Sequence, residues 1–425
     1  MIGSKRIVIT GMGIVAPNGV GLRNFSKALF AGESGIRFIP KLQELNFGCQ
    51  VGGIPALSQE QIEAYFTPLQ LRNFKSDGII YGCIAGQDAW TDAGLTVSDL
   101  KTDYDSGVVF GTGTSGLEKL KEAFSLIDHG KVKRLGSTAV IQTMASGVSA
   151  YLSGILGLGN QVTTNSSACS TGAEAILIGY ERIKLGKAVR MLVGSTCEHG
   201  AYLWGGFDAM RVTNHKHNDA PNKASRPMSA SAAGLVPGSG AGALVLETLE
   251  SALSRGAPIY AELIGGAVNS GGQRNGGTLT APNSEAVQRC IKQALKEAAI
   301  TPQEIDLING HLTATAKDAV EIQNWVTALD LNRNDFPLIQ GTKSLVGHCF
   351  SASGAIESVA TVLQIKEATV HPSINSEDLH ADIVSLIGTN KVPQQAVQKD
   401  IQVAVKASFG FGDVNACVVF KKYKP

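Results

Sequence analysis

The sequence has little charge of either sign. Only 17% of its 425 residues are charged, and 37 basic residues against 36 acidic ones leave a net charge of +1. A chain with so balanced a charge has no global field that would attract nucleic acid or anionic lipid. We therefore expect no nucleic-acid partner, and any acidic partner must be bound by a local basic patch.

Long apolar runs and paired cysteines are also missing. No uninterrupted apolar segment approaches the ~20 residues that a bilayer-spanning helix needs, and the start, MIGSKRIVITGMGIVAPNG, shows no typical small-residue cleavage site of a secretion signal. The seven cysteines are widely spaced, odd in number and without a CxxC pair, which argues against a disulfide framework and a zinc site. We expect a cytoplasmic protein with no membrane partner and no bound metal.

The residues that are abundant indicate an α/β enzyme. Hydrophobic residues make up 44% of the chain and glycines number 49. Short β-branched runs, such as Gly107 to Phe110 and Ile401 to Val405, alternate with helical patterns, of which Ala286 to Ala299 is the best marked. The run from Arg6 to Ile9 predicts a strand that enters a tight turn at residues 10–13.

The length of the chain exceeds the usual size of one compact domain. After a short helical stretch that ends at Gly256, a second long segment opens with a strand near Pro258. We predict two halves, residues 1–256 with the candidate nucleophile and residues 257–425 with two histidine motifs. The halves share no detectable sequence repeat, so a duplication would be structural only.

One cysteine has informative neighbours. Cys169 lies in QVTTNSSACSTGAEAILI, residues 161–178, between an extended run and a helix that begins near Ser170. A thiol in the first turn of a helix is close to unpaired N–H groups and the positive end of the helix dipole, which favour the thiolate. Such a thiolate could attack a thioester, with its own backbone N–H as an oxyanion donor. The competing interpretation is a buried structural thiol, the commonest fate of a free cysteine.

Four motifs occur in an order that resembles a known family. Residues 167–172, Ser-Ala-Cys-Ser-Thr-Gly, resemble the nucleophile motif of the β-ketoacyl-[acyl carrier protein] synthases, residues 309–315 and 341–348 resemble their two histidine motifs, and residues 408–412 match their glycine-rich loop. The resemblance covers essentially the whole chain. It implies the thiolase-type α/β fold, with two similar halves in a five-layer αβαβα arrangement, and a homodimer as the usual unit.

The resemblance also implies a reaction. Such an acyltransferase condenses an acyl chain on its cysteine with malonyl-[acyl carrier protein], losing carbon dioxide, in fatty acid or related polyene and polyketide synthesis. By resemblance, Cys169 holds the acyl chain, His311 and His348 hydrogen-bond the malonyl thioester carbonyl, Lys343 orients the histidine side, and Phe409 supplies a backbone oxyanion donor and gates the site. Two histidines favour the elongating branch. No cofactor is implied beyond the phosphopantetheine that the carrier protein brings.

Other residues are implied along the path of the substrate. Those placed beside the phosphopantetheine arm or the acyl channel are Thr313, Thr315, Thr280 and Thr114. The candidates for a basic patch that binds the acidic carrier protein are Arg72, Lys75 and Arg211. For each of these basic residues the alternative is an ordinary solvated surface charge.

The motifs depart from the usual family pattern at a few positions. Leu312 and Ala314 replace a glycine and a serine of the first histidine motif, and Asp413 and Val414 stand where glycine and threonine are usual. These changes leave the chain length, the saturation of the acyl chain and the pathway open. They suggest a specialised synthase for a polyene or other secondary product as readily as one for housekeeping fatty acids.

Three other interpretations stay open. Residues 111–116, GTGTSG, satisfy the GxGxxG pattern of a dinucleotide-binding loop, although no second strand with a ribose-binding acidic residue is evident. A thiolase-type acyltransferase would need a second catalytic cysteine, and Cys417 lies too far past the glycine-rich loop to fit that role. A non-catalytic or weakly active chain-length subunit of a ketosynthase heterodimer would generally lack the nucleophile that Cys169 provides.

Overall fold

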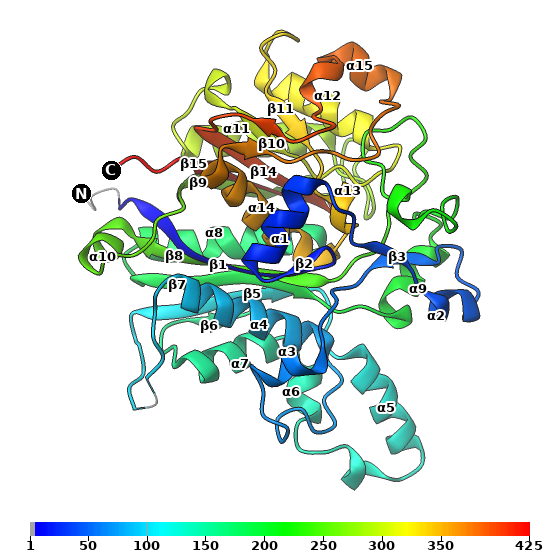
Figure 1. Ribbon diagram of the computed structural model, residues 1–425, viewed down its shortest axis with the longest axis vertical. Coiled ribbons are helices and arrows are strands. Elements are labelled where there is room, and N and C mark those ends of the chain that lie inside the picture. Colours follow the sequence, from blue (N-terminus) through cyan, green and yellow to red (C-terminus); the bar gives the residue numbers. More distant parts are fainter. Residues whose placement is uncertain (1–4, 99) are drawn as a thin grey trace.

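Two groups of five strands share one pairing pattern in the computed structural model, which describes residues 5–98 and 100–425 (Figure 1). The first group runs in the order β1 (Ile7–Ala16), β8 (Gly240–Thr248), β7 (Arg190–Cys197), β5 (Ser106–Thr112) and β6 (Val162–Thr163). The second runs β9 (Ala261–Ser270), β15 (Val414–Lys421), β14 (Val403–Gly410), β10 (Leu307–Asn309) and β11 (Leu338–Gln340). In both groups the first two pairings are antiparallel and the last two parallel. The chain is therefore built from a duplicated α/β unit.

Helices separate and cover the two groups of strands. In the middle lie α8 (Thr171–Lys184) and α14 (Ser353–Glu367), which pack on each other (Figure 1). The outer face of the first group carries α4 (Asp77–Asp92) and α7 (Gly147–Leu156), and the second carries α11 (Ser284–Glu297) with α12 (Asp318–Leu329) beside it. Most of α14 is buried on every side, as a helix of a central layer must be. The predicted five-layer αβαβα fold is confirmed.

Two glycines bring the central helices into backbone contact. A Cβ atom on Gly172 of α8 would lie 2.3 Å from the backbone nitrogen of Ala355, and a Cβ on Gly354 of α14 would lie 2.5 Å from that of Ala173. No real side chain tolerates such distances, so the crossing depends on both glycines. The close crossing places the start of α8, and with it Cys169, beside the start of α14.

The first strand differs from the prediction. Residues 10–13 do not turn, because β1 continues to Ala16 with a register shift between Ile9 and Gly11. The glycines serve the packing of α4 instead, since a Cβ on Gly11 would lie 2.1 Å from the carbonyl oxygen of Ala89 and one on Gly13 would lie 1.9 Å from that of Ala85. A glycine pair in an apolar run indicated a turn, whereas here it permits close helix–strand contact.

Other elements lie close to their predicted positions. Helix α11 begins at Ser284, and the side chain of Asn283 caps it by accepting hydrogen bonds from the backbone N–H groups of Glu285 and Ala286. The predicted half-boundary at Gly256 falls between α10 (Leu249–Ser254) and β9 and stays a prediction. Across the described ranges, no helix is both long and apolar enough to span a membrane.

Candidate active site

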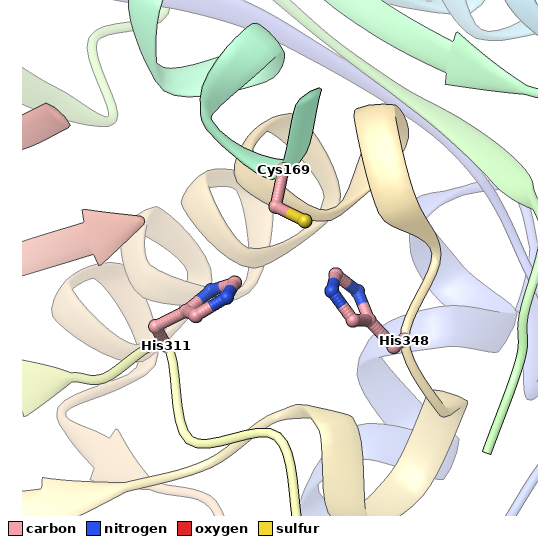
Figure 2. A group of neighbouring side chains, drawn as sticks. All are labelled: Cys169, His311 and His348. Carbon is pink, nitrogen blue, oxygen red and sulfur yellow. The ribbon is translucent and has the colours of Figure 1, made fainter. Parts of the chain in front are cut away.

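Three side chains from distant parts of the chain converge at the centre of the molecule. Cys169 lies in the single turn Ala168–Ser170 that leads into α8, His311 follows β10, and His348 follows α13 (Lys343–Val346). One ligand atom of each lies within 4.8 Å of those of the other two, and Figure 2 shows the thiol and both rings facing a common space. All three are buried, and they line one cavity of about 460 Å³. The structure thus brings the three predicted residues together.

The cavity has a polar side and an apolar side. Thr280, Thr313 and Thr315 line it, as the prediction for the phosphopantetheine path requires. Val212, Leu235, Val287, Phe409 and Phe411 supply apolar surface. A largely apolar cavity with a few convergent polar groups is typical of a small-molecule binding site.

Two buried carboxylates fix the loop that carries His311. Glu321 accepts hydrogen bonds from the backbone N–H groups of His311 and Leu312, both at 2.7 Å. Asp318 accepts from Thr313 at 2.9 Å and from Ala314 at 3.1 Å. These contacts hold Leu312 and Ala314 in the left-handed region, at φ 28° and 62°. Neither acid could be given a role from the sequence, because a backbone-capping contact has no local pattern of its own.

Hydrogen bonds assign the same tautomer to both histidines. The ammonium of Lys343 lies 3.4 Å from Nδ1 of His311, and the backbone N–H of Phe350 donates to Nδ1 of His348 at 3.1 Å. Both groups only donate, so each Nδ1 accepts and each Nε2 carries the proton. The two rings can therefore offer Nε2–H donors to one substrate oxygen. Their planes meet at 82°, with centroids 5.4 Å apart.

Burial determines the charge state of these groups. Desolvation, with the positive charges of Lys343 and Lys406, lowers the pKa of His311 and of His348 well below the ordinary value, so both are neutral at neutral pH. Desolvation also raises the pKa of the Cys169 thiol, against the lowering effects of Lys343 and the Phe411 backbone. The expectation that the helix turn favours the thiolate is therefore wrong for the net pKa, because removal of the thiol from water outweighs the favourable contacts.

The glycine-rich loop lies directly against the nucleophile. A Cβ on Gly410 would lie 3.1 Å from the backbone nitrogen of Cys169, so the loop passes close to that N–H. The backbone N–H groups of Phe411 and of Cys169 itself face the Cys169 sulfur and act to lower the pKa of its thiol. Phe409 lines the cavity and meets His311 edge-on, with ring centroids 6.3 Å apart. The oxyanion and gating roles predicted for Phe409 stay predictions, and Phe411 is a donor that sequence analysis missed.

The remaining predicted residues lie at different distances from the cavity. Arg211 is exposed and directly precedes Val212, which lines the cavity. Arg72 is exposed in the segment before α4, and Lys75 forms an ion pair with Glu122 at 3.1 Å. Thr114 donates to Glu198 at 3.2 Å and is not among the lining residues that the structure describes. The substrate role of Thr114 and the carrier-binding roles of the three basic residues stay predictions.

The dinucleotide interpretation conflicts with a buried carboxylate. In residues 111–116 the chain passes from β5 to α5 (Leu117–Asp128), where a dinucleotide pyrophosphate would occupy the helix N-terminus. That position is filled by Glu198, which accepts from the backbone N–H of Gly116 at 3.1 Å and of Leu117 at 3.3 Å. A second anion there would be repelled.

Two other types of site also fit the structure poorly. Cys417 is fully buried on β15, in an apolar cluster with Cys290, and so does not provide the second thiol of a thiolase. One thiol and two imidazoles are ligand types that zinc accepts. However, the Lys343 ammonium 3.4 Å from His311 would repel a divalent cation.

Asp413, one of the departures from the family pattern, connects the glycine-rich loop to the rim of the cavity. Its carboxylate is buried and accepts from the backbone N–H of Gln273 at 2.9 Å and of Asn283 at 2.8 Å. The segment between these two residues contributes Asn275, Gly276 and Thr280 to the lining.

We expect Asp413→Ala to destabilise the protein by about 2–3 kcal/mol, because two buried N–H donors lose their acceptor. The KM for the carrier-bound substrate should rise more than kcat falls, since the rim would lose its anchor. Urea unfolding and steady-state kinetics check this, with Asp413→Asn, which keeps one acceptor, as the matched control. Unchanged stability in the alanine variant would contradict the anchoring role.

Comparison with known proteins gives consistent matches along the chain. The family described as "Beta-ketoacyl synthase, N-terminal domain" matches residues 4–252, and "Beta-ketoacyl synthase, C-terminal domain" matches residues 260–377. The 3-oxoacyl-[acyl-carrier-protein] synthase 1 of Haemophilus influenzae is 34% identical over 421 residues, which cover 99% of each chain.

Solved structures agree with this match. A ketosynthase described in complex with a type II polyketide acyl-carrier protein and bound to a hexaketide superposes with a TM-score of 0.87 at 28% identity, covering 99% of this chain and all of the other. The ishigamide ketosynthase/chain length factor superposes with a TM-score of 0.87 at 26% identity and the same coverage.

Proposed function

The chain belongs to the β-ketoacyl synthase family, and on that premise we propose that it catalyses the decarboxylating condensation of an acyl chain with malonyl-[acyl carrier protein]. The product is β-ketoacyl-[acyl carrier protein], in fatty acid or related polyene and polyketide synthesis. The observation that carries the proposal is the convergence of Cys169, His311 and His348 on one buried cavity. That arrangement supplies a nucleophile and two neutral donors in a buried site.

In the first half-reaction the Cys169 sulfur attacks the carbonyl carbon of an acyl thioester. The new S–C bond forms while the S–C bond to the carrier breaks, and the carrier leaves as a thiolate that takes up a proton. We assign the oxyanion donors to the backbone N–H groups of Cys169 and Phe411, in place of the Phe409 N–H expected from the sequence, because these two groups face the Cys169 sulfur. The raised thiol pKa requires deprotonation on binding, which the Lys343 charge assists.

In the second half-reaction His311 and His348 bind the malonyl thioester carbonyl through their Nε2–H groups. The bond to the malonyl carboxylate breaks, carbon dioxide leaves, and its electron pair passes into an enolate that the two donors stabilise. The enolate carbon attacks the acyl–Cys169 thioester, and the thiolate of Cys169 is released. Neutral imidazoles suit this role because both supply hydrogen-bond donors without giving up a proton.

The partner we propose is an acidic acyl carrier protein, which delivers both substrates on its phosphopantetheine arm. Thr280, Thr313 and Thr315 line the cavity and can hydrogen-bond that arm. Arg211, which precedes the lining residue Val212, is the basic candidate nearest the cavity along the chain. No further cofactor is needed for the chemistry.

We also propose that the active unit is a homodimer. Strand β6 is at the edge of its group, where Val162 is 42% exposed, and an open strand edge can pair with a second copy. Light scattering of the purified chain tests this, since a monomer that becomes active only with a second ketosynthase-like chain would favour a heterodimer.

Intact-mass analysis tests the reaction. The protein should gain the mass of one acyl group from an acyl carrier protein of matching chain length, and addition of malonyl carrier protein should then remove it and release β-ketoacyl carrier. A panel of acyl chains would identify the preferred substrate. If no acyl chain is transferred or condensed, the proposal fails and a chain-length subunit becomes the better interpretation.

The lowered histidine pKa values predict an unusual pH profile. A free imidazole gains its proton near pH 6.5, but His311 and His348 keep their neutral form well below that. We therefore expect the rate of malonyl-carrier decarboxylation to stay nearly constant as the pH falls from 8 through 6.5. Measured carbon dioxide release checks this, with His348→Ala as a control that lowers the rate about 10²-fold at every pH. A loss of half the rate near pH 6.5 would show that the imidazoles titrate as exposed groups.

A further inference from the structure

A second lysine is buried behind the active site. Lys406 lies on β14 and is 0% exposed. Its Nζ is 2.8 Å from Oε2 of Glu357, while Nζ of Lys343 is 2.6 Å from Oε1 of the same carboxylate. Lys406 also donates to the backbone carbonyl of Ala407 and to Oγ of Ser408, the latter at 3.2 Å. One carboxylate therefore joins two buried ammonium groups.

The cluster contains one ammonium group more than its single carboxylate can neutralise. Glu357 is 1% exposed and already balances Lys343, which is also 1% exposed. A second buried cation costs desolvation energy that the shared carboxylate cannot fully offset, and burial accordingly lowers the pKa of Lys406. A purely structural position on a buried strand would be filled more stably by an apolar side chain. The cluster carries one net positive charge next to the catalytic histidines.

We propose that Lys406 is a positioning residue of the active site, which holds Glu357 between two cations and links that carboxylate to the backbone carbonyl of Ala407 and the hydroxyl of Ser408. Lys406 faces Oε2 of Glu357 as an ion pair without hydrogen-bond geometry, while Lys343 donates a hydrogen bond to Oε1. Lys343 then keeps a proton for Nδ1 of His311, 3.4 Å away. Ser408 directly precedes Phe409, and its carbonyl accepts from the Ser170 hydroxyl at 3.2 Å, so the residue whose hydroxyl Lys406 contacts also joins the glycine-rich loop to the nucleophile turn.

The buried charge has a measurable consequence for the histidines. Its field disfavours a second positive charge nearby, so it helps to keep both imidazoles neutral as Nε2–H donors. The titratable groups that interact electrostatically with Lys406 are Lys343, Glu357, Glu321, His311, His348 and Cys417. The role of Lys406 in catalysis rests on the proposed function, whereas its effect on the pKa values of the two imidazoles does not.

An NMR titration of the histidines tests the role of Lys406. Protein labelled with ¹³C at histidine Cε1 is titrated by NMR as wild type and as Lys406→Met, with signals assigned through His311→Ala and His348→Ala. We expect the titration of His311 and His348 to move up by about one pH unit in the methionine variant. The acid limb of malonyl-carrier decarboxylation should move with it.

Two matched variants separate charge from packing. Ser408→Ala removes a hydrogen bond of Lys406 and keeps its charge, so the histidine titration should stay in place. Lys119 is 1% exposed and shares Glu122 with Lys75 in the same one-carboxylate arrangement, far along the chain from the histidine motifs. Lys119→Met therefore controls for the replacement of a buried lysine by a neutral side chain in an ion pair whose carboxylate is partly exposed.

The titrations and the activity measurement distinguish a structural role of Lys406 from an electrostatic one. If Lys406→Met lowers the melting temperature as Lys119→Met does and leaves both histidine titrations unchanged, Lys406 is structural only and the inference is overturned. If wild type shows no decarboxylation but the titrations shift as expected, the proposed function fails while the electrostatic role stands.

Discussion

Replacement of Cys169 by alanine is expected to abolish acyl transfer and to lower the condensation rate by at least about 10³-fold. No other described thiol can substitute, because the six remaining cysteines are buried and none lines the cavity. The fold should survive, since the change removes one sulfur from a turn held by backbone contacts of its neighbours. Intact mass with an acyl carrier protein and a thermal melt measure the two effects separately.

The same variant separates the two half-reactions. His311, His348 and Lys343 keep their contacts in Cys169→Ala, so malonyl-carrier decarboxylation should continue within about tenfold of the wild-type rate. Cys169→Ser is the matched control, because a hydroxyl of similar size is far less acidic than a thiol and should not be acylated at a useful rate. An alanine variant that still forms β-ketoacyl product would mean that the acyl chain is not held on Cys169.

The fold and the centre of the site could be predicted because their determinants are local. Cys169, His311 and His348 each lie in a short motif at the end of a strand or the start of a helix, and the resemblance of these motifs to those of the β-ketoacyl synthases implied both the five-layer fold and the three convergent side chains. Thr280, Thr313 and Thr315 line the cavity, and their contact with the phosphopantetheine arm, which the same resemblance implied, stays a prediction. The apolar runs located the starts of β1, β5 and β14 to within a few residues.

Contacts between distant segments could not be predicted from the sequence. Gly11 and Gly13 suggested a turn, and only the position of α4 shows that they make room for its backbone. The net pKa of Cys169 depends on the burial of its whole surroundings, which outweighs the helix turn that the sequence displays. Lys406 shows no motif at all, since its role depends on Glu357, which approaches from α14.

Replacement of Glu357 by glutamine should be the most destabilising single change at this site. Lys343 and Lys406 would lose their shared counterion while both stay buried, and breaking a buried pair in this way costs about 3–5 kcal/mol. The glutamine amide group would also direct N–H donors at one of the two ammonium groups. Since a folded protein is stable by only about 5–15 kcal/mol, the unfolding midpoint in urea should fall sharply.

Two comparisons show whether the cost arises from the unpaired charges. In the double variant Glu357→Gln with Lys406→Met, only Lys343 needs a partner and the amide oxygen can supply one, so roughly half of the lost stability should return. Glu122→Gln breaks the matching Lys75–Glu122–Lys119 arrangement, but the Glu122 and Lys75 side chains are 31% and 46% exposed, so only Lys119 loses its counterion while buried and the loss should be smaller than in Glu357→Gln. If Glu357→Gln cost no more than Glu122→Gln, the two lysines would not both be charged in the folded protein, because two buried ammonium groups without a counterion cannot be held at so small a cost.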